Sequence, residues 1–273
     1  MPELPEVEVL RRSLEPHVVG ATIKSVRVWN PDLREPVNRR HLGTCRGRQI
    51  VAARRRAKYL LLDLTGGKTM VVHLGMSGRL TLALSSALPE PHEHVSIFLD
   101  SGRRLRFRDT RRFGLVLVRS TRGLEADSHF AHLGLEPLAG ALDGEVLKTL
   151  AVGRRSPIKS FLMDGRIVVG VGNIYAVEAL HRAGIHPTRS VARISTDRWG
   201  RLASAVRETL SEAIDQGGTT LNDFTDAQGE SGYFKVSLSV YDREGQTCRR
   251  CQRSIRRIVQ SGRSTFYCPG CQR

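Results

Sequence analysis

The chain has 273 residues and carries 43 Lys or Arg against 27 Asp or Glu, a formal net charge of +16 at pH 7. This excess favours a polyanionic partner, most simply nucleic acid; a ribosome-like or generally basic protein is the alternative. No apolar run approaches the length of a membrane span and no basic, apolar leader opens the chain, so the sequence predicts a bacterial cytoplasmic protein with no membrane partner.

The first half of the chain predicts one helix followed by short strands. Apolar residues recur at helical spacing between residues 5 and 17, at Val7, Leu10 and Leu14. Runs with strand character follow, separated by turn signals, at 22–29, 49–55, 59–64, 69–74, 79–84, 94–100, 103–109 and 114–118. Evenly spaced short strands of this kind predict an antiparallel sandwich or barrel.

After residue 124 the pattern lengthens into predicted helices, several of which begin at Ser, Asp or Asn and end at Gly. They cover 141–152, 156–165, 173–184 and 195–218. The length suits two domains, and we predict an α+β fold. Its segments are a helix and antiparallel β-sandwich domain over 1–124, a linker over 125–140, a helical domain over 141–222, a loop over 223–240 and a tail over 241–273.

Four of the five cysteines lie in the tail as two close pairs that are sixteen residues apart: Cys248 and Cys251, then Cys268 and Cys271. This spacing matches a structural zinc site, in which four thiolates close a tetrahedron and leave no open position for a substrate. Disulfides are the alternative, which a reducing compartment disfavours. We expect one structural Zn²⁺ per chain, no organic cofactor, and a β-hairpin between the pairs with its turn at 261–262. The fifth cysteine, Cys45, is expected to be an ordinary thiol.

Seven motifs follow one another along the whole chain. They are PELPEVE (2–8), RRAKYLLLDL (55–64), HLGMSG (73–78), DTRRFG (109–114), GVGNIYAVEALHRAGIHP (170–187), QGESGYFKVSLSVYDREG (228–245) and the cysteine hairpin. In this order they resemble the formamidopyrimidine-DNA glycosylases, bacterial enzymes that remove oxidised purines. The resemblance implies a catalytic sandwich domain, a helix-two-turn-helix element in 141–222, a lesion-capping loop over 223–240 and a zinc hairpin. It also implies a monomer that binds double-stranded DNA containing oxidised purines and acts as both glycosylase and abasic-site lyase.

In this light the acidic N-terminus becomes the candidate active site. Methionine before proline is commonly removed, which would leave Pro2 with a free secondary amine that can act as a nucleophile. Attack on a sugar C1′ gives an iminium that is cationic at any pH and drives elimination of the flanking phosphates. By resemblance, Glu3 transfers protons at the sugar and Glu6 positions the amine. The alternatives are a stiff residue before a helix for Pro2 and favourable charge at a helix N-terminus for the glutamates.

Further residues match family positions that handle the everted nucleotide. An enzyme acting on a base must extrude it from the stack and fill the gap. Met76, Arg111 and Phe113 match the void-filling residues, with Phe113 as the wedge and Arg111 as the reader of the widowed base, preferentially cytosine; core packing is the alternative for Met76 and Phe113. By resemblance, Lys58 is a catalytic residue that contacts the lesion and its phosphate and takes part in elimination; an ordinary surface lysine is the alternative. His73 is expected to support a phosphate contact.

Phosphate contacts are expected from the second half of the chain. Asn173 is predicted to cap the helix that begins at Ile174 and to bind a phosphate at the helix N-terminus, and Arg263 near the hairpin tip is predicted to clamp another. Lesion choice is expected from the segment 220–234, although Asn222 stands where many relatives have Lys or Arg. Two other departures from the family pattern are Ala57 and Gln252, both at positions where glycine is usual.

Two other functions remain open at the level of the sequence. One is an enzyme resembling endonuclease VIII, which prefers oxidised pyrimidines; PELPE in place of PEGPE, and the RRF of DTRRFG, argue against it. The other is a catalytically silent module that binds damaged DNA or RNA on the same scaffold, which a retained Met1 would produce.

Overall fold

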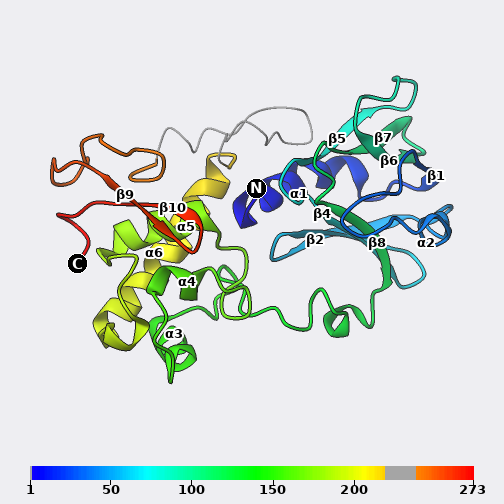
Figure 1. Ribbon diagram of the computed structural model, residues 1–273. Helices are drawn as coiled ribbons and strands as arrows, with labels where there is room; N and C mark the ends of the chain where they lie inside the picture. The colour runs from blue at the N-terminus through cyan, green and yellow to red at the C-terminus, as the bar shows by residue number, and fades with distance from the viewer. Residues whose placement is uncertain (1, 219–237) are drawn as a thin grey trace. The chain divides into compact units, whose positions relative to one another are not determined.

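The computed structural model describes residues 2–218 and 238–273 (Figure 1). Within these residues the chain forms two compact units, one made of 2–131 with 216–218 and the other of 132–215 with 238–273. The finer boundaries predicted from the sequence, at 124, 140, 222 and 240, stay predictions. No helix in the described part of the chain is long and apolar enough to cross a bilayer.

The first unit opens with helix α1 (Leu4–Val18), which confirms the predicted helix over 5–17. A proline in its first turn suits the helix start, because proline has no amide hydrogen to leave unpaired there. The apolar face is buried completely, with Leu4, Leu10 and Leu14 exposed by 1% or less. This face packs against β2 and β3, so the N-terminus is held by the sandwich.

The described strands of the first unit form two antiparallel four-stranded sheets, at the positions predicted from the sequence. One sheet has the order β2-β3-β4-β8, with bounds β2 Ile50–Arg56, β3 Tyr59–Leu64, β4 Lys68–His73 and β8 Leu115–Ser120. The other has the order β1-β6-β7-β5, with bounds β1 Ile23–Val28, β5 Gly78–Leu84, β6 Glu93–Leu99 and β7 Arg103–Asp109. Since each sheet is separate, the sandwich is correct and the barrel alternative is wrong.

One apolar core fills the space between these sheets and under α1. Side chains from β3, β4 and β8 meet side chains from β5, β6 and β7 in a single cluster that includes Leu62, Met70, Ile97, Leu105 and Phe107. Alternating side chains on each strand supply this face, as expected for sheets with one face in the core. The turns that join the strands at the sheet ends are therefore free to carry functional side chains.

The second unit is helical and ends in a β-hairpin. Its main helices are α3 (Gly144–Ala151), α4 (Ile158–Leu162), α5 (Asn173–Ala183) and α6 (Thr196–Asp215), and α6 packs on both α3 and α5. The hairpin consists of β9 (Arg256–Gln260) and β10 (Arg263–Tyr267). Its two turn residues, Ser261 and Gly262, have φ of 49° and 72°, which a two-residue hairpin loop requires; the predicted turn is confirmed.

Candidate functional site

The N-terminal segment is ordered and buried. Pro2 is buried, and Glu3 and Glu6 are only 3% and 2% exposed. The Glu3 backbone N–H donates to Glu6 Oε2 at 2.7 Å, and the Glu3 carboxylate accepts from the Glu6 backbone in return. This capping box satisfies donors that a helix start otherwise leaves unpaired. It also fixes both carboxylates beside Pro2.

A second contact joins this helix start to the edge of the sheet. Glu8 lies between Arg11, Arg12 and Arg55, with Arg55 Nε donating to Glu8 Oε2 at 3.2 Å. Burial alone would raise the pKa of Glu8, but hydrogen bonds from Arg11 and Arg12 hold that pKa below its usual value. Because Arg55 belongs to β2, the ionised Glu8 ties α1 to the turn at 57–58.

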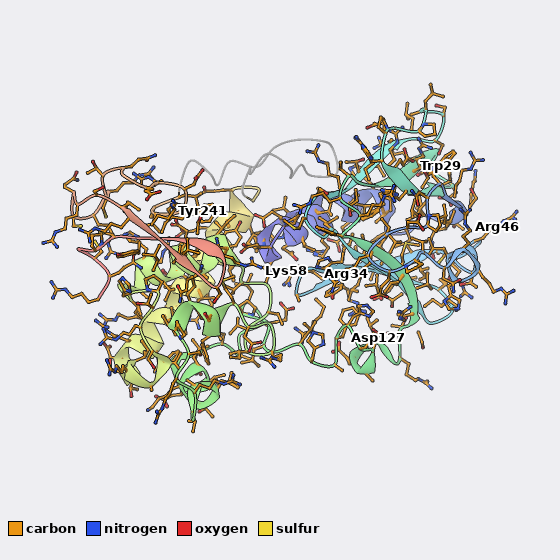
Figure 2. All side chains as sticks on the ribbon, viewed as in Figure 1. Trp29, Arg34, Arg46, Lys58, Asp127 and Tyr241 are labelled. Carbon is orange, nitrogen blue, oxygen red and sulfur yellow. The ribbon has the colours of Figure 1, made fainter. Side chains whose placement is uncertain are left out.

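That turn carries Lys58, labelled in Figure 2, near enough to His73 for its charge to act on the imidazole. Burial lowers the pKa of His73 to about 4, and the positive charge of Lys58 contributes to the shift. His73 is therefore neutral at pH 7, and its Nδ1 accepts from the Gly75 N–H at 3.0 Å. His73 thus holds the backbone of the 73–75 segment, and its support of a phosphate contact stays a prediction.

Met76, Arg111 and Phe113 lie on two loops at one end of the sandwich. Phe113 is 45% exposed and Met76 is half-buried, and neither belongs to the core cluster. The Arg111 guanidinium lies over the Phe113 ring, 4.8 Å from its centroid, a cation–π arrangement. The core-packing alternative for Phe113 does not fit this exposure, and its role as a wedge stays a prediction.

In the second unit, Asn173 makes a different contact from the predicted one. Gly172 is the N-cap and Asn173 is the first helical residue of α5, so its predicted capping role is wrong. Its Nδ2 instead donates to the Ser264 carbonyl at 3.0 Å, and the buried Lys159 Nζ donates to Thr265 Oγ1 at 2.6 Å. Both bonds hold β10 directly after Arg263, which is exposed at the hairpin tip.

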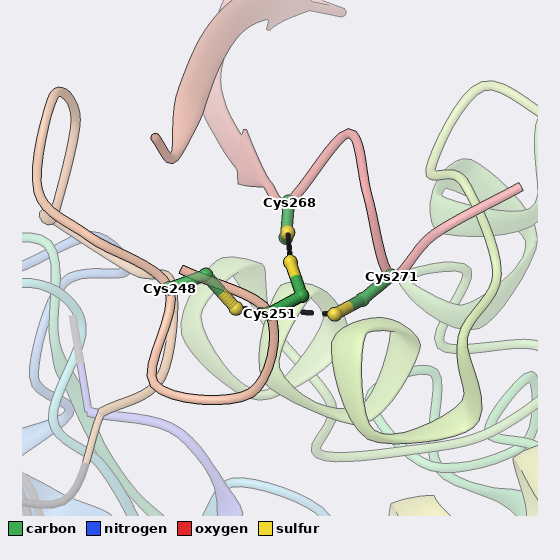
Figure 3. A group of neighbouring side chains, drawn as sticks. All are labelled: Cys248, Cys251, Cys268 and Cys271. Atoms are coloured by element: carbon green, nitrogen blue, oxygen red, sulfur yellow. Dashed lines mark hydrogen bonds between the residues drawn. The ribbon is translucent and has the colours of Figure 1, made fainter. Parts of the chain in front are cut away.

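The four tail cysteines converge on one point (Figure 3). Their Sγ atoms all lie within 4.8 Å of one another, with Cys251 and Cys268 3.2 Å apart and Cys248 and Cys271 3.9 Å apart. A tetrahedral site with Zn–S bonds of about 2.3 Å separates its sulfurs by about 3.8 Å. The cysteines thus fit one zinc ion, and none of them forms a disulfide. Cys45 is buried elsewhere, and burial raises its pKa to about 11, as expected of an inert thiol.

Neighbouring side chains hold these ligands. His181 Nε2 on α5 lies 3.7 Å from Cys248 Sγ. Gln272 accepts from the Cys268 backbone at 2.8 Å and donates to the Ile185 carbonyl at 2.9 Å. Contacts of this kind commonly orient metal ligands. They connect the four cysteines to α5 and to the residue after the turn that follows it, Ile185.

Ala57 and Gln252 both adopt backbone conformations that favour glycine. Their φ values are 53° and 63°, in the left-handed region that costs an ordinary residue about 1–2 kcal/mol. The extra side chains are accommodated without loss of the turn at 57–58 or of the cysteine cluster. Both departures from glycine therefore place a side chain on left-handed backbone. The third departure, Asn222, lies outside the described residues.

Family models match the chain in three consecutive parts. The formamidopyrimidine-DNA glycosylase N-terminal domain matches residues 1–116, the helix-two-turn-helix (H2TH) domain of the same enzymes residues 133–225, and the zinc finger found in these enzymes and isoleucyl-tRNA synthetases residues 245–273. The chain belongs to the formamidopyrimidine-DNA glycosylase family. Members similar to it over their whole length include the formamidopyrimidine-DNA glycosylase of Xanthomonas axonopodis pv. citri (strain 306), 50% identical over 100% of both chains.

Solved structures of family members share the fold. The Thermus thermophilus protein is 38% identical with a TM-score of 0.89, covering 99% of this chain and 98% of that one. A Lactococcus lactis variant of the enzyme, solved in complex with a Fapy-dG-containing DNA, is 31% identical with a TM-score of 0.93 over 100% of both chains. The predicted fold is confirmed, including the helix-two-turn-helix region and the zinc hairpin.

Several residues whose hydrogen bonds hold the candidate site in place were not predicted from the sequence. Asp109 and Ser77 lie inside the motifs DTRRFG and HLGMSG but were not singled out, although an acidic residue at the head of an arginine-rich loop was a visible signal. Arg55 and Glu8 were also missed, because nothing in their local sequence indicates that β2 and α1 meet.

Proposed function

We propose that this protein is a bifunctional DNA glycosylase and abasic-site lyase that excises oxidised purines, such as 8-oxoguanine and formamidopyrimidines, from duplex DNA. Membership of the family over the whole chain supports this function. The observation that carries the proposal is the N-terminus itself, where Pro2 precedes two buried glutamates and the Glu3 backbone N–H donates to the Glu6 carboxylate at 2.7 Å. A terminus of this kind differs from the frayed start of most domains.

The chemistry begins at the Pro2 nitrogen once Met1 has been removed. Its lone pair forms a bond to C1′ while the electrons of the glycosidic bond leave with the base, which takes a proton from Glu3. The Pro2 nitrogen then gives its proton to Glu3, the C1′–O4′ bond breaks, O4′ takes that proton from Glu3, and an iminium joins C1′ to Pro2. Loss of a C2′ proton expels the 3′ phosphate, and a second elimination expels the 5′ phosphate. Glu6 keeps the terminus in place through the Glu3 backbone.

The other candidate residues bind and hold the DNA. Lys58 contacts the lesion and its adjacent phosphate, and His73, kept neutral, supports that contact. Phe113 and Met76 fill the vacated stack while Arg111 donates to the widowed cytosine. Asn173 and Arg263 bind phosphates, which fix the register and explain much of the positive charge. The zinc ligated by the four cysteines would stabilise the hairpin without contacting the substrate, and we propose a monomer acting in the cytoplasm.

Borohydride trapping tests this function directly. The iminium is reduced to a stable covalent bond, so the protein is expected to form a trapped adduct with a duplex that contains one 8-oxoguanine opposite cytosine. Trapping only on duplexes with an oxidised pyrimidine would favour the endonuclease VIII-like alternative. Tight binding to damaged duplex without any adduct would show a silent binding protein.

The exposure of Phe113 leads to a second test. Phe113→Ala should leave the melting temperature nearly unchanged, because the ring is 45% exposed, whereas truncating a core phenylalanine would cost about 3–5 kcal/mol. Excision of 8-oxoguanine from duplex should slow much more than cleavage of a preformed abasic site, where no base has to leave the stack. A large fall in melting temperature, with equal losses of activity on both substrates, would show that Phe113 is a packing residue and not a wedge.

Arg111→Ala provides the matching control in the same loop. It should share the selective loss on 8-oxoguanine and, unlike Phe113→Ala, weaken the preference for cytosine as the opposite base. The substitution would remove a hydrogen-bond donor to that base, worth about 1–3 kcal/mol of discrimination for a good bidentate contact. An unchanged opposite-base preference would contradict this assignment.

A further inference from the structure

We propose that Asp109 is a positioning residue that joins the two void-filling loops, 75–78 and 109–114, into one preformed element. This inference rests on the proposed function, since it concerns how Met76, Arg111 and Phe113 are presented to DNA. Asp109 is only 1% exposed, and its carboxylate bonds to the loop backbone and to Ser77 rather than to the side chains that would touch DNA. Asp109 would therefore influence DNA binding and base eversion only by fixing the position of the two loops.

The Asp109 carboxylate accepts hydrogen bonds from both loops. Oδ1 accepts from Ser77 Oγ at 2.6 Å and from the Arg111 N–H at 3.2 Å. Oδ2 accepts from the Gly114 N–H at 2.7 Å. The Arg111 N–H also donates to Ser77 Oγ at 3.0 Å. One buried side chain thus fixes the backbone on either side of Phe113 and connects it to the residue after Met76.

Asp109 is itself held rigidly by the sandwich. It is the last residue of β7 and pairs with Gly78, the first residue of β5. Its backbone N–H donates to the His92 carbonyl at 3.1 Å, and its carbonyl lies 2.8 Å from His94 Nε2. Because the Asp109 backbone is anchored on both sides, its carboxylate can hold both loops in a fixed position relative to the sheet.

The loops also approach too closely to move independently. A Cβ on Gly75 would lie 2.4 Å from the Phe113 carbonyl carbon, and a Cβ on Gly114 would lie 2.7 Å from the His73 carbonyl oxygen. Arg112, between the two functional residues, has a φ of 58°, which is unfavourable for a side chain that is not glycine. Strained backbone persists only where its surroundings hold it, and the Asp109 bonds on both sides of Arg112 supply that restraint.

This arrangement requires a hydrogen-bond acceptor on each oxygen of the Asp109 side chain. The groups bonded to it, the Ser77 hydroxyl and the Arg111 and Gly114 amides, all act as donors. A carboxylate offers acceptors on both oxygens, whereas an asparagine amide must turn an NH₂ group toward one side. Asp109→Asn therefore removes acceptor capacity while changing the side-chain volume very little.

Pre-organised loops would speed base eversion, because the cost of ordering Phe113 and Arg111 is met before DNA binds. A displacement of about 1 Å in such an element can lower a rate by about a hundredfold. Asp109→Asn is therefore expected to reduce excision of 8-oxoguanine from duplex by about tenfold to a hundredfold. Cleavage of a preformed abasic site should fall far less, and the preference for cytosine opposite the lesion should weaken.

Hydrogen exchange measures the loops independently of activity. In Asp109→Asn the amides of Arg111 and Gly114 should exchange faster, while core amides of β4 and β7 keep their protection. Asp63→Asn is the matched control, because Asp63 also accepts side-chain hydrogen bonds within the sandwich, from Arg54 and Thr69, away from these loops. It should leave the ratio of the two activities unchanged. Ser77→Ala, which removes one bond only, should give a smaller effect in the same direction.

The outcomes separate the two proposals. If wild-type protein forms no trapped adduct, the proposed function fails, but hydrogen exchange still tests the loop element. Equal losses on both substrates in Asp109→Asn, or unchanged exchange at Arg111 and Gly114, would overturn the positioning role. Should Asp109→Asn fail to fold, Ser77→Ala decides the matter by the same two measurements.

Discussion

Pro2→Gly and Glu3→Gln are expected to abolish base excision and the borohydride-trapped adduct while leaving the binding of an abasic-site analogue largely intact. Glycine at position 2 would replace the secondary amine with a primary amine and would lose the pyrrolidine ring that holds the nitrogen in place. Glutamine at position 3 keeps a hydrogen-bonding side chain but cannot transfer a proton, and general acid–base groups contribute about 10²–10⁴ to a rate. These are the largest effects expected from any single change in the first unit.

Single-turnover excision and trapping on the same duplex would measure both variants. Glu15→Gln on the same helix is the control, since its side chain is 48% exposed and pairs with Arg11 far from the N-terminus; it should retain wild-type rates. Intact mass should show that Met1 is absent from each active preparation. A wild-type rate of excision by Pro2→Gly or by Glu3→Gln would show that the N-terminus does not take part in the mechanism.

Much of the fold could be predicted because it depends on local pattern. The spacing of Leu10 and Leu14 predicts a helix with one buried face, and strand alternation between turn signals predicts where the strands lie, although not which sheet each strand joins. The cysteine spacing predicted the metal cluster for a similar reason. Two close pairs leave few ways to bring four thiols together other than around one ion.

Contacts between distant segments were not predictable in the same way. Asp109 receives hydrogen bonds from Ser77, 32 residues earlier, and Asn173 donates to Ser264, 91 residues later. The local sequence around each of these residues does not indicate which distant residue it contacts. The error at Asn173 follows directly, because an asparagine near a helix start usually caps it, and only the folded hairpin shows a competing acceptor. The family was easier to predict than these contacts, because whole motifs identify it, whereas a contact depends on which motifs meet in the folded chain.

Cys248→Ser should have the largest effect in the second unit, abolishing DNA binding while the first unit stays folded. The hairpin contributes only Ile255, Phe266 and cysteines to a small apolar cluster that it shares with Val177 of α5 and Val240, and we expect this cluster to be too small to order the hairpin without a metal. Structural zinc in small domains contributes about 10–16 kcal/mol, which is in effect folding free energy. Elemental analysis should find one zinc per chain in wild-type protein and almost none in the variant.

Cys45→Ser and Arg263→Ala distinguish loss of the metal from loss of a thiol or of a charge. Cys45 lies buried in the sandwich core, so its variant should keep zinc and DNA binding. Arg263→Ala should keep zinc but weaken binding on all sequences and lower the slope of log K against log salt by about 0.9, as expected for one lost phosphate contact. Cys248→Ser should instead lose zinc and nearly all binding together. Full activity in wild-type protein that contains no zinc would refute the structural role of the metal, because the hairpin would then fold and hold DNA by its protein contacts alone.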